Sequence, residues 1–287
     1  MSTGYLYVLG AALLWGTIGV FSKRVLEHGV PPIEIAFWRA ALAGLAFLVQ
    51  ALVTRTLKLQ RRSDALGLLA FALIGVSLFY TALNVAIDEG GISLAFVLLY
   101  TAPAFVALLA ALLLGEKLTA QKSVLVGLSI VGVAMVAQGG GEGMRVTVAS
   151  ISWGLISGLS YASYYLFGKW LLKRYPVVTI YAIVMPLGAL GLLPFVKFSA
   201  FSAPPSVWLD LGLMALFCTY LAYRLYFTGL RQVEASRAVL VATIEPVVAA
   251  VLAASLFGER LGVLAIVGGV LVLSAAALAS RPARSKS

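Results

Sequence analysis

Ten apolar stretches of about 20 residues follow one another along this chain, with only short polar segments between them. Seven of the stretches contain no charged residue, and three, near 32–53, 207–230 and 235–257, contain one or two. An α-helix of this length crosses the roughly 30 Å hydrocarbon layer of a bilayer. With 62% hydrophobic and 11% charged residues, the chain leaves no long polar part for a soluble domain. We therefore predict an all-α integral membrane fold of ten transmembrane helices.

Basic residues are unevenly distributed among the predicted loops. If the N-terminus is cytoplasmic, the cytoplasmic loops and tail at 55–62, 117–122, 169–174, 231–237 and 281–286 hold most of the 21 lysines and arginines. Cytoplasmic loops of membrane proteins are enriched in these residues. We predict that both termini are cytoplasmic. The net charge of +10 then needs no nucleic-acid partner.

The chain contains two related halves. Residues 93–118 read SLAFVLLYTAPAFVALLAALLLGEKL, and residues 236–261 read SRAVLVATIEPVVAAVLAASLFGERL. A shift of 143 positions aligns these stretches without a gap and also pairs Tyr80 with Tyr223. We predict that each half is a unit of five helices.

The odd number of helices determines how the halves are oriented. A unit that crosses the membrane five times leaves its copy to enter from the opposite side, so a pseudo-two-fold axis in the membrane plane relates the two. Many secondary transporters have this plan and expose a site between the repeats to each side in turn. We predict a first repeat at 1–138, a glycine-rich linker at 139–147, a second repeat at 148–280 and a cytoplasmic tail at 281–287.

Three motifs resemble the EamA-type repeat of the drug/metabolite transporter superfamily: Trp15-Gly16, Pro103 with Gly115-Glu116-Lys117-Leu118, and Pro246 with Gly258-Glu259-Arg260-Leu261. Within that superfamily the chain is most similar to the YddG-type bacterial amino-acid exporters, known for aromatic amino acids. The resemblance implies a ten-helix basket in the bacterial inner membrane. It also implies a central cavity lined by helices one to four and six to nine, with helices five and ten peripheral. One departure is Tyr161-Ala162, which stands where the first half has Trp15-Gly16.

Two ionisable residues lie deep in predicted helices. Glu245 is about ten residues into the ninth helix and Arg39 about seven into the second, roughly 15 and 10 Å deep at 1.5 Å per residue. Ionisable groups at membrane depth are costly and are functional candidates by default. Glu245 would attract a substrate ammonium group or carry a proton; alternatively, it caps a carbonyl freed by Pro246. Arg39 would meet a substrate carboxylate, pair with an acidic residue, or snorkel to the surface.

Aromatic and amide side chains complete the predicted site. Tyrosine and tryptophan normally lie at the membrane interfaces, but several here fall near the midplane. Apolar walls with a few hydrogen-bonding groups are typical of small-molecule sites, and aromatic rings attract ammonium ions. Packing between helices is the alternative for any single residue. The predicted substrate-binding residues are Trp15, Arg39, Tyr80, Asn84, Tyr100, Tyr161, Tyr165, Tyr223 and Glu245.

Polar residues at the ends of predicted helices are expected to be structural. The Gly-Glu-Lys/Arg-Leu motifs at Glu116 and Glu259 are interpreted as helix terminators. Lys169 is expected to anchor its helix at the interface, and Arg224 to snorkel to the surface. Tyr226 fits the interfacial belt of aromatic residues.

These features predict a secondary transporter that exports small amphipathic metabolites, amino acids and aromatic ones among them, by alternating access. Protons are a candidate coupling ion, and plain downhill flow is the other option. Export of cationic drugs and a non-transporting membrane scaffold are the alternative functions; anionic nucleotide-sugars would need more basic residues than Arg39 and Arg224. The sequence has no GxxxxGK[ST] motif, and His28 and Cys218 are isolated, so we expect no ATP-driven step, no enzyme activity, no metal and no cofactor. The expected partners are the bilayer and a small molecule, and the expected state is a monomer or weak dimer.

Overall fold

The fold consists of helices alone in the part of the chain that the computed structural model describes, residues 3–138, 146–257 and 262–279. Eight of its ten helical segments are long and apolar enough to cross a membrane. The other two are α9, whose 24 residues include many serines and glycines, and the shorter apolar helix α15. The predicted all-α membrane fold is thereby confirmed. The tail at 281–287, most of the linker and the motif at Glu259 lie outside the described residues.

The first half of the chain forms five segments, of which the first, third and fourth are irregular. The first breaks at Thr17, the third contains a π-helical stretch, and the fourth breaks at residues 100–101. Its elements are α1 (Thr3–Gly16), α2 (Ile18–Leu26), α3 (Pro32–Val53), α4 (Asp64–Phe71), the π-helix η1 (Ala72–Leu78), α5 (Phe79–Gly90), α6 (Ile92–Leu99), α7 (Ala102–Leu114) and α8 (Ala120–Gln138).

The second half repeats this pattern with a continuous first helix. Short 3₁₀ turns, η2 and η3, follow its second helix. Its elements are α9 (Val148–Leu171), α10 (Val177–Leu192), η2 (Leu193–Phe195), η3 (Ser199–Ser202), α11 (Pro205–Leu213), the π-helix η4 (Met214–Leu221), α12 (Ala222–Leu230), α13 (Ala235–Ala242), α14 (Glu245–Phe257) and α15 (Val263–Ala279).

The irregular points of the two halves occupy equivalent positions. The shift of 143 places the break at residues 243–244 on the break at 100–101, and it places η4 on η1. At each break a threonine hydroxyl donates to the carbonyl three residues earlier, at 2.6 Å. Pro103 and Pro246 follow the breaks and lack the amide hydrogen that a continuous helix would need. Both repeats therefore carry interrupted helices at the same depth, and such irregular stretches are common at functional sites.

Contacts at one end of the bundle show that the halves run in opposite directions. A β-carbon on Gly4, at the start of α1, would come within 2.9 Å of the Val233 side chain. Lys169, near the end of α9, donates to the carbonyl oxygen of Val233. Since α1 and α9 are the first helices of their halves, one begins where the other finishes. This confirms the inverted arrangement.

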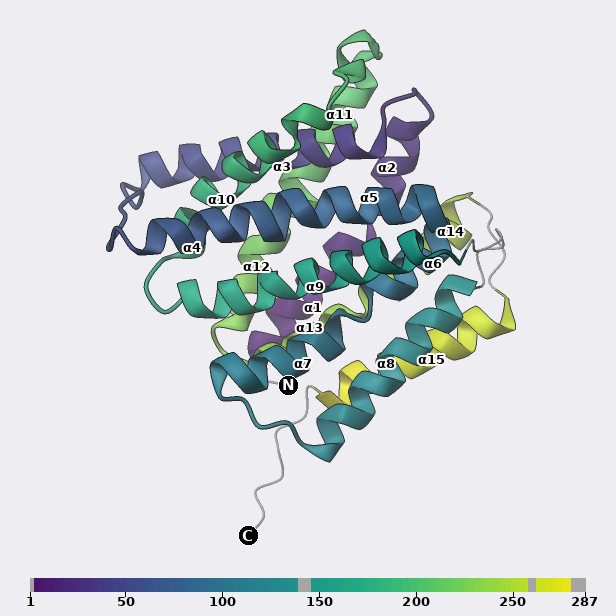
Figure 1. Cartoon of the computed structure of the whole chain (residues 1–287). Helices are drawn as coiled ribbons and strands as arrows, with labels where there is room; N and C mark the ends of the chain where they lie inside the picture. Colours follow the sequence, from purple (N-terminus) through teal and green to yellow (C-terminus); the bar gives the residue numbers. More distant parts are fainter. Residues whose placement is uncertain (1–2, 139–145, 258–261, 280–287) are drawn as a thin grey trace.

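The helices α8 and α15 lie side by side at one edge of the bundle (Figure 1). They cross closely at Gly132 and Gly268: a β-carbon on Gly132 would lie 2.8 Å from the Gly268 carbonyl oxygen. Ser129 on α8 donates to the Thr243 hydroxyl at 2.9 Å, which ties the pair to the break between α13 and α14. The two helices are peripheral, as the resemblance implies.

Candidate functional site

Aromatic side chains from both repeats meet in the centre of the bundle. Tyr223 on α12 is stacked between Tyr164 and Tyr181, with ring centroids 5.6 and 4.8 Å away and interplanar angles of 8° and 12°. Trp15 on α1 contacts Tyr223 edge to face at 5.6 Å and Tyr226 at 5.2 Å. All five rings are buried. We use the name central cluster for these five rings together with the residues, described in the next paragraphs, that interact with them.

Arg39 on α3 is the basic side chain of the central cluster. Its Cζ atom lies 4.8 Å from the centroid of the Tyr80 ring, and its charge also acts on Tyr164 and Tyr223 of the second repeat. Its buried Nε atom has no hydrogen-bond partner. A guanidinium presents five N–H donors, so Arg39 keeps donors for an anionic group. This placement favours a role inside the cluster over snorkelling.

Glu245 is the acidic side chain of the central cluster. It interacts electrostatically with the Tyr100 hydroxyl and with the charge of Arg39. The sequence placed Glu245 inside a continuous helix, which is wrong: the break at residues 243–244 makes it the first residue of α14. A carboxylate is favoured at a helix N-terminus because the partial charge there is positive.

Gly16 accounts for the close approach of α1 to the start of α14. A β-carbon on Gly16 would lie 3.2 Å from the Glu245 carbonyl oxygen and 2.6 Å from Val248 Cβ. Only a residue without a side chain fits this contact. The Trp15-Gly16 motif thus places one aromatic ring in the central cluster and lets the helix carrying Glu245 lie beside it.

The other predicted residues divide into two groups. Tyr161 and Tyr165, one turn apart on α9, share a hydrogen bond of 3.4 Å between their hydroxyls, and Tyr161 stacks on Phe79 at 5.4 Å. Asn84 instead donates from Nδ2 to the Tyr80 carbonyl oxygen at 2.8 Å, one turn back on its own helix. The side chains of all the predicted site residues therefore interact with others of the site, except that of Asn84, which reaches only the Tyr80 backbone.

Sequence reasoning missed two members of the cluster and misplaced a third. Tyr164 and Tyr181 were not selected, and Tyr226 was assigned to the interface although it is 1% exposed and packs on Trp15. The hydroxyls of all three tyrosines are buried without a protein hydrogen-bond partner. Tyr164 could have been found from its spacing, because it lies three residues after Tyr161 and shares that helix face.

A family model described as the EamA-like transporter family matches residues 2–138 and, a second time, residues 148–281. This chain belongs to the EamA-like transporter family. An uncharacterized transporter of Archaeoglobus fulgidus is 30% identical over 264 residues, which cover 90% of this chain and 92% of the relative. The uncharacterized inner membrane transporter YicL of Salmonella typhimurium is 26% identical, with 99% and 97% covered. A solved structure at 17% identity shares the fold, with a TM-score of 0.81 over 98% of this chain and 97% of the other.

Family membership makes this EamA-like protein a multi-pass membrane transporter, and the names of its relatives point to transport rather than to catalysis. The central cluster then lies where many inverted-repeat carriers hold substrate, between repeats and beside interrupted helices. Among the described residues, no three histidine, cysteine, aspartate or glutamate side chains are grouped as metal ligands would be.

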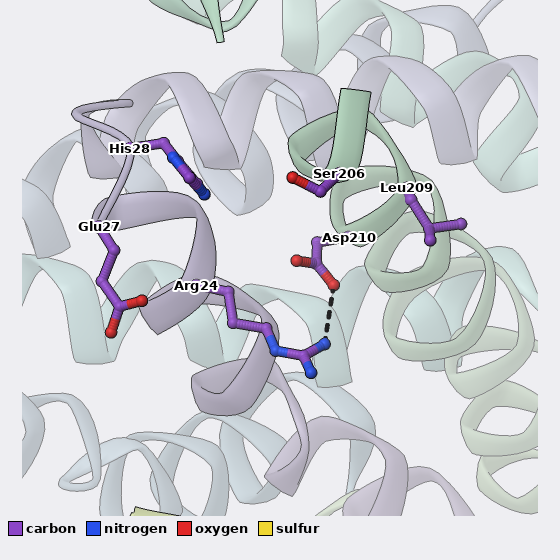
Figure 2. Close-up of a pocket in the computed structure, with 6 residues that line it drawn as sticks. All are labelled: Arg24, Glu27, His28, Ser206, Leu209 and Asp210. Carbon is purple, nitrogen blue, oxygen red and sulfur yellow. Dashed lines mark hydrogen bonds and ion pairs between the residues drawn. The ribbon is translucent and has the colours of Figure 1, made fainter. Parts of the chain in front are cut away.

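A second, shallower feature of this transporter lies at one end of the bundle, between α2 and α11. It is a pocket of about 300 Å³ crossed by an ion pair of 3.2 Å between Arg24 Nη1 and Asp210 Oδ1 (Figure 2). The arginine side chain is 58% exposed. The pocket is lined by Arg24, Glu27, His28, Ser206, Leu209 and Asp210.

Proposed function

We propose that this transporter exports small amphipathic metabolites, most specifically amino acids and aromatic ones among them, by alternating access to the central cluster. One observation carries the proposal: Arg39 and Glu245 bring opposite charges from opposite repeats into one aromatic cluster. A free amino acid carries the complementary pair. Its carboxylate suits the guanidinium donors, and its ammonium group suits Glu245 and the faces of the rings.

The cluster also supplies surfaces for a substrate side chain. Trp15 and Tyr223 offer ring faces and edges, which pack well against an aromatic or aliphatic group. Tyr161 and Tyr165 add hydroxyls, and Asn84 retains its amide oxygen as an acceptor. We assign Tyr80 to holding Arg39 in place and Tyr100 to holding Glu245. The units that move past each other would be the repeats at 1–138 and 148–280.

The proposed orientation in the membrane rests on the distribution of basic residues. The end of the bundle that carries Asp64, Glu116 and Lys169 also holds most of the basic loops, which supports a cytoplasmic position for this end and for both termini. Substrate would then reach the cluster from that end and leave at the other.

Ligand binding to purified protein tests the substrate class. Phenylalanine, tyrosine and tryptophan should raise the unfolding temperature, because a ligand that binds only the folded state stabilises it. Phenethylamine and phenylpropionate, which each lack one charged group, should have much smaller effects. Equal stabilisation by all three classes, or none by any amino acid, would contradict the proposal. Counterflow of labelled phenylalanine in proteoliposomes then tests transport itself.

Cationic drugs are the second candidate substrate class, because Glu245 and the rings would receive a cation while Arg39 stays over Tyr80. Ethidium or tetraphenylphosphonium should then be transported, and Arg39→Ala should not reduce their transport. Preference for these cations over amino acids in the same proteoliposomes would favour this function. A protein that leaves the efflux of both classes unchanged in overproducing cells would be a scaffold.

A further inference from the structure

The carboxylate of Glu116 joins the two repeats at one end of the bundle. Glu116 follows Gly115, whose positive φ of 70° ends α7. Its Oε1 accepts a hydrogen bond from the Ala235 backbone N–H at 2.7 Å, and its Oε2 accepts from the backbone N–H of Ser236 at 3.2 Å and from the Ser236 hydroxyl. These donors belong to the first turn of α13. The motif interpreted as a plain helix terminator therefore also caps a helix of the opposite repeat.

A lysine reinforces this contact across the same boundary. Lys122 Nζ lies 3.0 Å from Glu234 of the second repeat and 3.7 Å from Glu116 of its own repeat, and its side chain is 8% exposed. Lys169 behaves differently: it donates to carbonyl oxygens of the turn between α12 and α13, all within the second repeat. Lys169 thus stabilises that turn from the end of its own helix.

Among the described residues, the opposite end of the bundle does not repeat this packing. The pseudo-two-fold axis maps α7 onto α14 and α13 onto α6. The helices α7 and α13 pack together, whereas α6 and α14 form no comparable interface within the described residues. Other related pairs do pack alike, such as α1 with α12 and α5 with α9. The pseudo-two-fold symmetry is therefore broken at the interface between α7 and α13, where Glu116 lies.

The ion pairs between the repeats show the same asymmetry. Near Glu116, Asp64 is 2% exposed and accepts hydrogen bonds from Arg174 at 2.6 Å and from the Tyr175 hydroxyl at 2.8 Å. At the other end a second ion pair between the repeats, Arg24 with Asp210, is longer, at 3.2 Å, and borders the pocket of Figure 2. The pair near Glu116 is the shorter of the two, and its arginine is the less exposed, although the other end is also joined: Glu34 accepts hydrogen bonds from the backbone N–H groups of Ser199 and Ala200.

We propose that Glu116 is a latch that closes this end of the substrate pathway and that its carboxylate must leave α13 once in each transport cycle. The inference rests on the proposed function in one respect, that the central cluster is the transport site. Opening would transfer the carboxylate and the α13 amides to water, which hydrogen-bonds both. Lys122 stays with Glu116 in the first repeat, so the charge keeps a partner. These features make the contact reversible, as a gate requires.

Accessibility of the pathway behind the latch provides the first test. Ala238 is buried on α13, just inside the latch, so a single cysteine is placed there by Ala238→Cys in a Cys218→Ser background. A water-soluble maleimide should label this cysteine slowly. Glu116→Ala should raise the labelling rate about tenfold or more, because charge-assisted hydrogen bonds are lost from the closed state. The control Glu89→Ala removes an exposed carboxylate elsewhere and should leave the rate unchanged.

A covalent latch provides the second test, in case Glu116→Ala folds poorly. Glu116→Cys with Ser236→Cys, also in the Cys218→Ser background, is joined by a short bis-methanethiosulfonate, which forms a disulfide with each cysteine as methanesulfinate leaves and is cleaved by a reductant, and the product is reconstituted. Cross-linking should abolish counterflow, and cleaving the linker should restore it. Full transport by the cross-linked protein, or unchanged labelling in a folded Glu116→Ala protein, overturns the latch while leaving the substrate assignment intact. Faster labelling in Glu116→Ala without any effect of amino acids would overturn the substrate class and support the latch.

Discussion

Arg39 of the first repeat and Glu245 of the second interact electrostatically inside a cluster built almost wholly of aromatic rings. Isolated charges are expensive in a membrane interior. Here each has a group that offsets part of this cost: the Tyr80 ring for Arg39 and the Tyr100 hydroxyl for Glu245. A zwitterionic ligand could insert between the two charges and satisfy both.

Replacing the guanidinium should separate recognition of carboxylates from recognition of amines. Arg39→Ala is expected to weaken phenylalanine binding at least about tenfold, which corresponds to ~1.4 kcal/mol, while phenethylamine binding changes little. Arg39→Lys should rescue only part of the loss, because an ammonium cannot form the paired hydrogen bonds of a guanidinium. Isothermal titration of purified protein measures both ligands. Arg224→Ala is the matched control, since Arg224 is exposed and bonded to Tyr220 outside the cluster.

Neutralising Glu245 tests whether it carries the coupling proton. Glu245→Gln keeps the shape and one acceptor for Tyr100 but cannot release a proton. Counterflow of labelled substrate should persist, whereas uptake driven by a pH gradient across proteoliposomes should fall to the rate without a gradient. A variant that retains the full gradient-driven rate would exclude Glu245 as the proton carrier. Tyr100→Phe, which removes the hydroxyl partner but leaves the carboxyl in place, should keep the response to the gradient.

The Gly16 contact predicts a strong difference between two glycines of α1. Gly16→Ala places a methyl group 2.6 Å from Val248 Cβ and should destabilise the fold by ~1–3 kcal/mol through overpacking. Gly10→Ala meets only Leu225 at 3.5 Å, an ordinary contact, and should be neutral or slightly stabilising because alanine favours helices. Thermal unfolding in detergent compares them. Similar unfolding temperatures for both variants would show that α1 and α14 are not pressed together.

The central tyrosine stack should contribute to stability through its ring. Tyr223→Ala would leave a void between Tyr164 and Tyr181 and should cost ~3–5 kcal/mol, as for other large aromatic truncations. Tyr223→Phe keeps the stacking surface and should cost less than about 1 kcal/mol. Denaturant titrations followed by tryptophan fluorescence give both values. A large loss with phenylalanine would mean that the hydroxyl, rather than the ring, holds the stack.

The two ion pairs between the repeats should differ in strength. Asp64→Asn leaves Arg174 without its buried partner and should destabilise the protein by ~3 kcal/mol. Asp210→Asn breaks a pair whose arginine is largely in solvent and should cost less than about 1 kcal/mol. Unfolding temperatures of the two isosteric variants, measured at the same pH and salt concentration, give the comparison. The reverse order would show that the exposure of the arginine does not decide how much each pair contributes to stability.

Much of the candidate site could be predicted from sequence. Along a transmembrane helix, the depth of a residue in the bilayer increases almost linearly with its position in the sequence. Trp15, Arg39, Tyr100 and Glu245 stood out since polar or aromatic groups are uncommon at that depth. Asn84 satisfied the same criterion, yet its amide is turned onto its own helix. Depth identifies a level in the bilayer, but it does not determine which way a side chain points.

What the sequence by itself determined is the number of helices, their order and the inversion of the two repeats. The length of an apolar run is set by bilayer thickness, and an odd count forces the second copy to face the other way. Only the tertiary structure decided that Tyr164 and Tyr181 enclose Tyr223, that Gly16 brings α1 against α14, and that Glu116 caps α13 of the opposite repeat. These contacts join segments that are far apart in the chain. They depend on tertiary packing, which local sequence patterns do not specify.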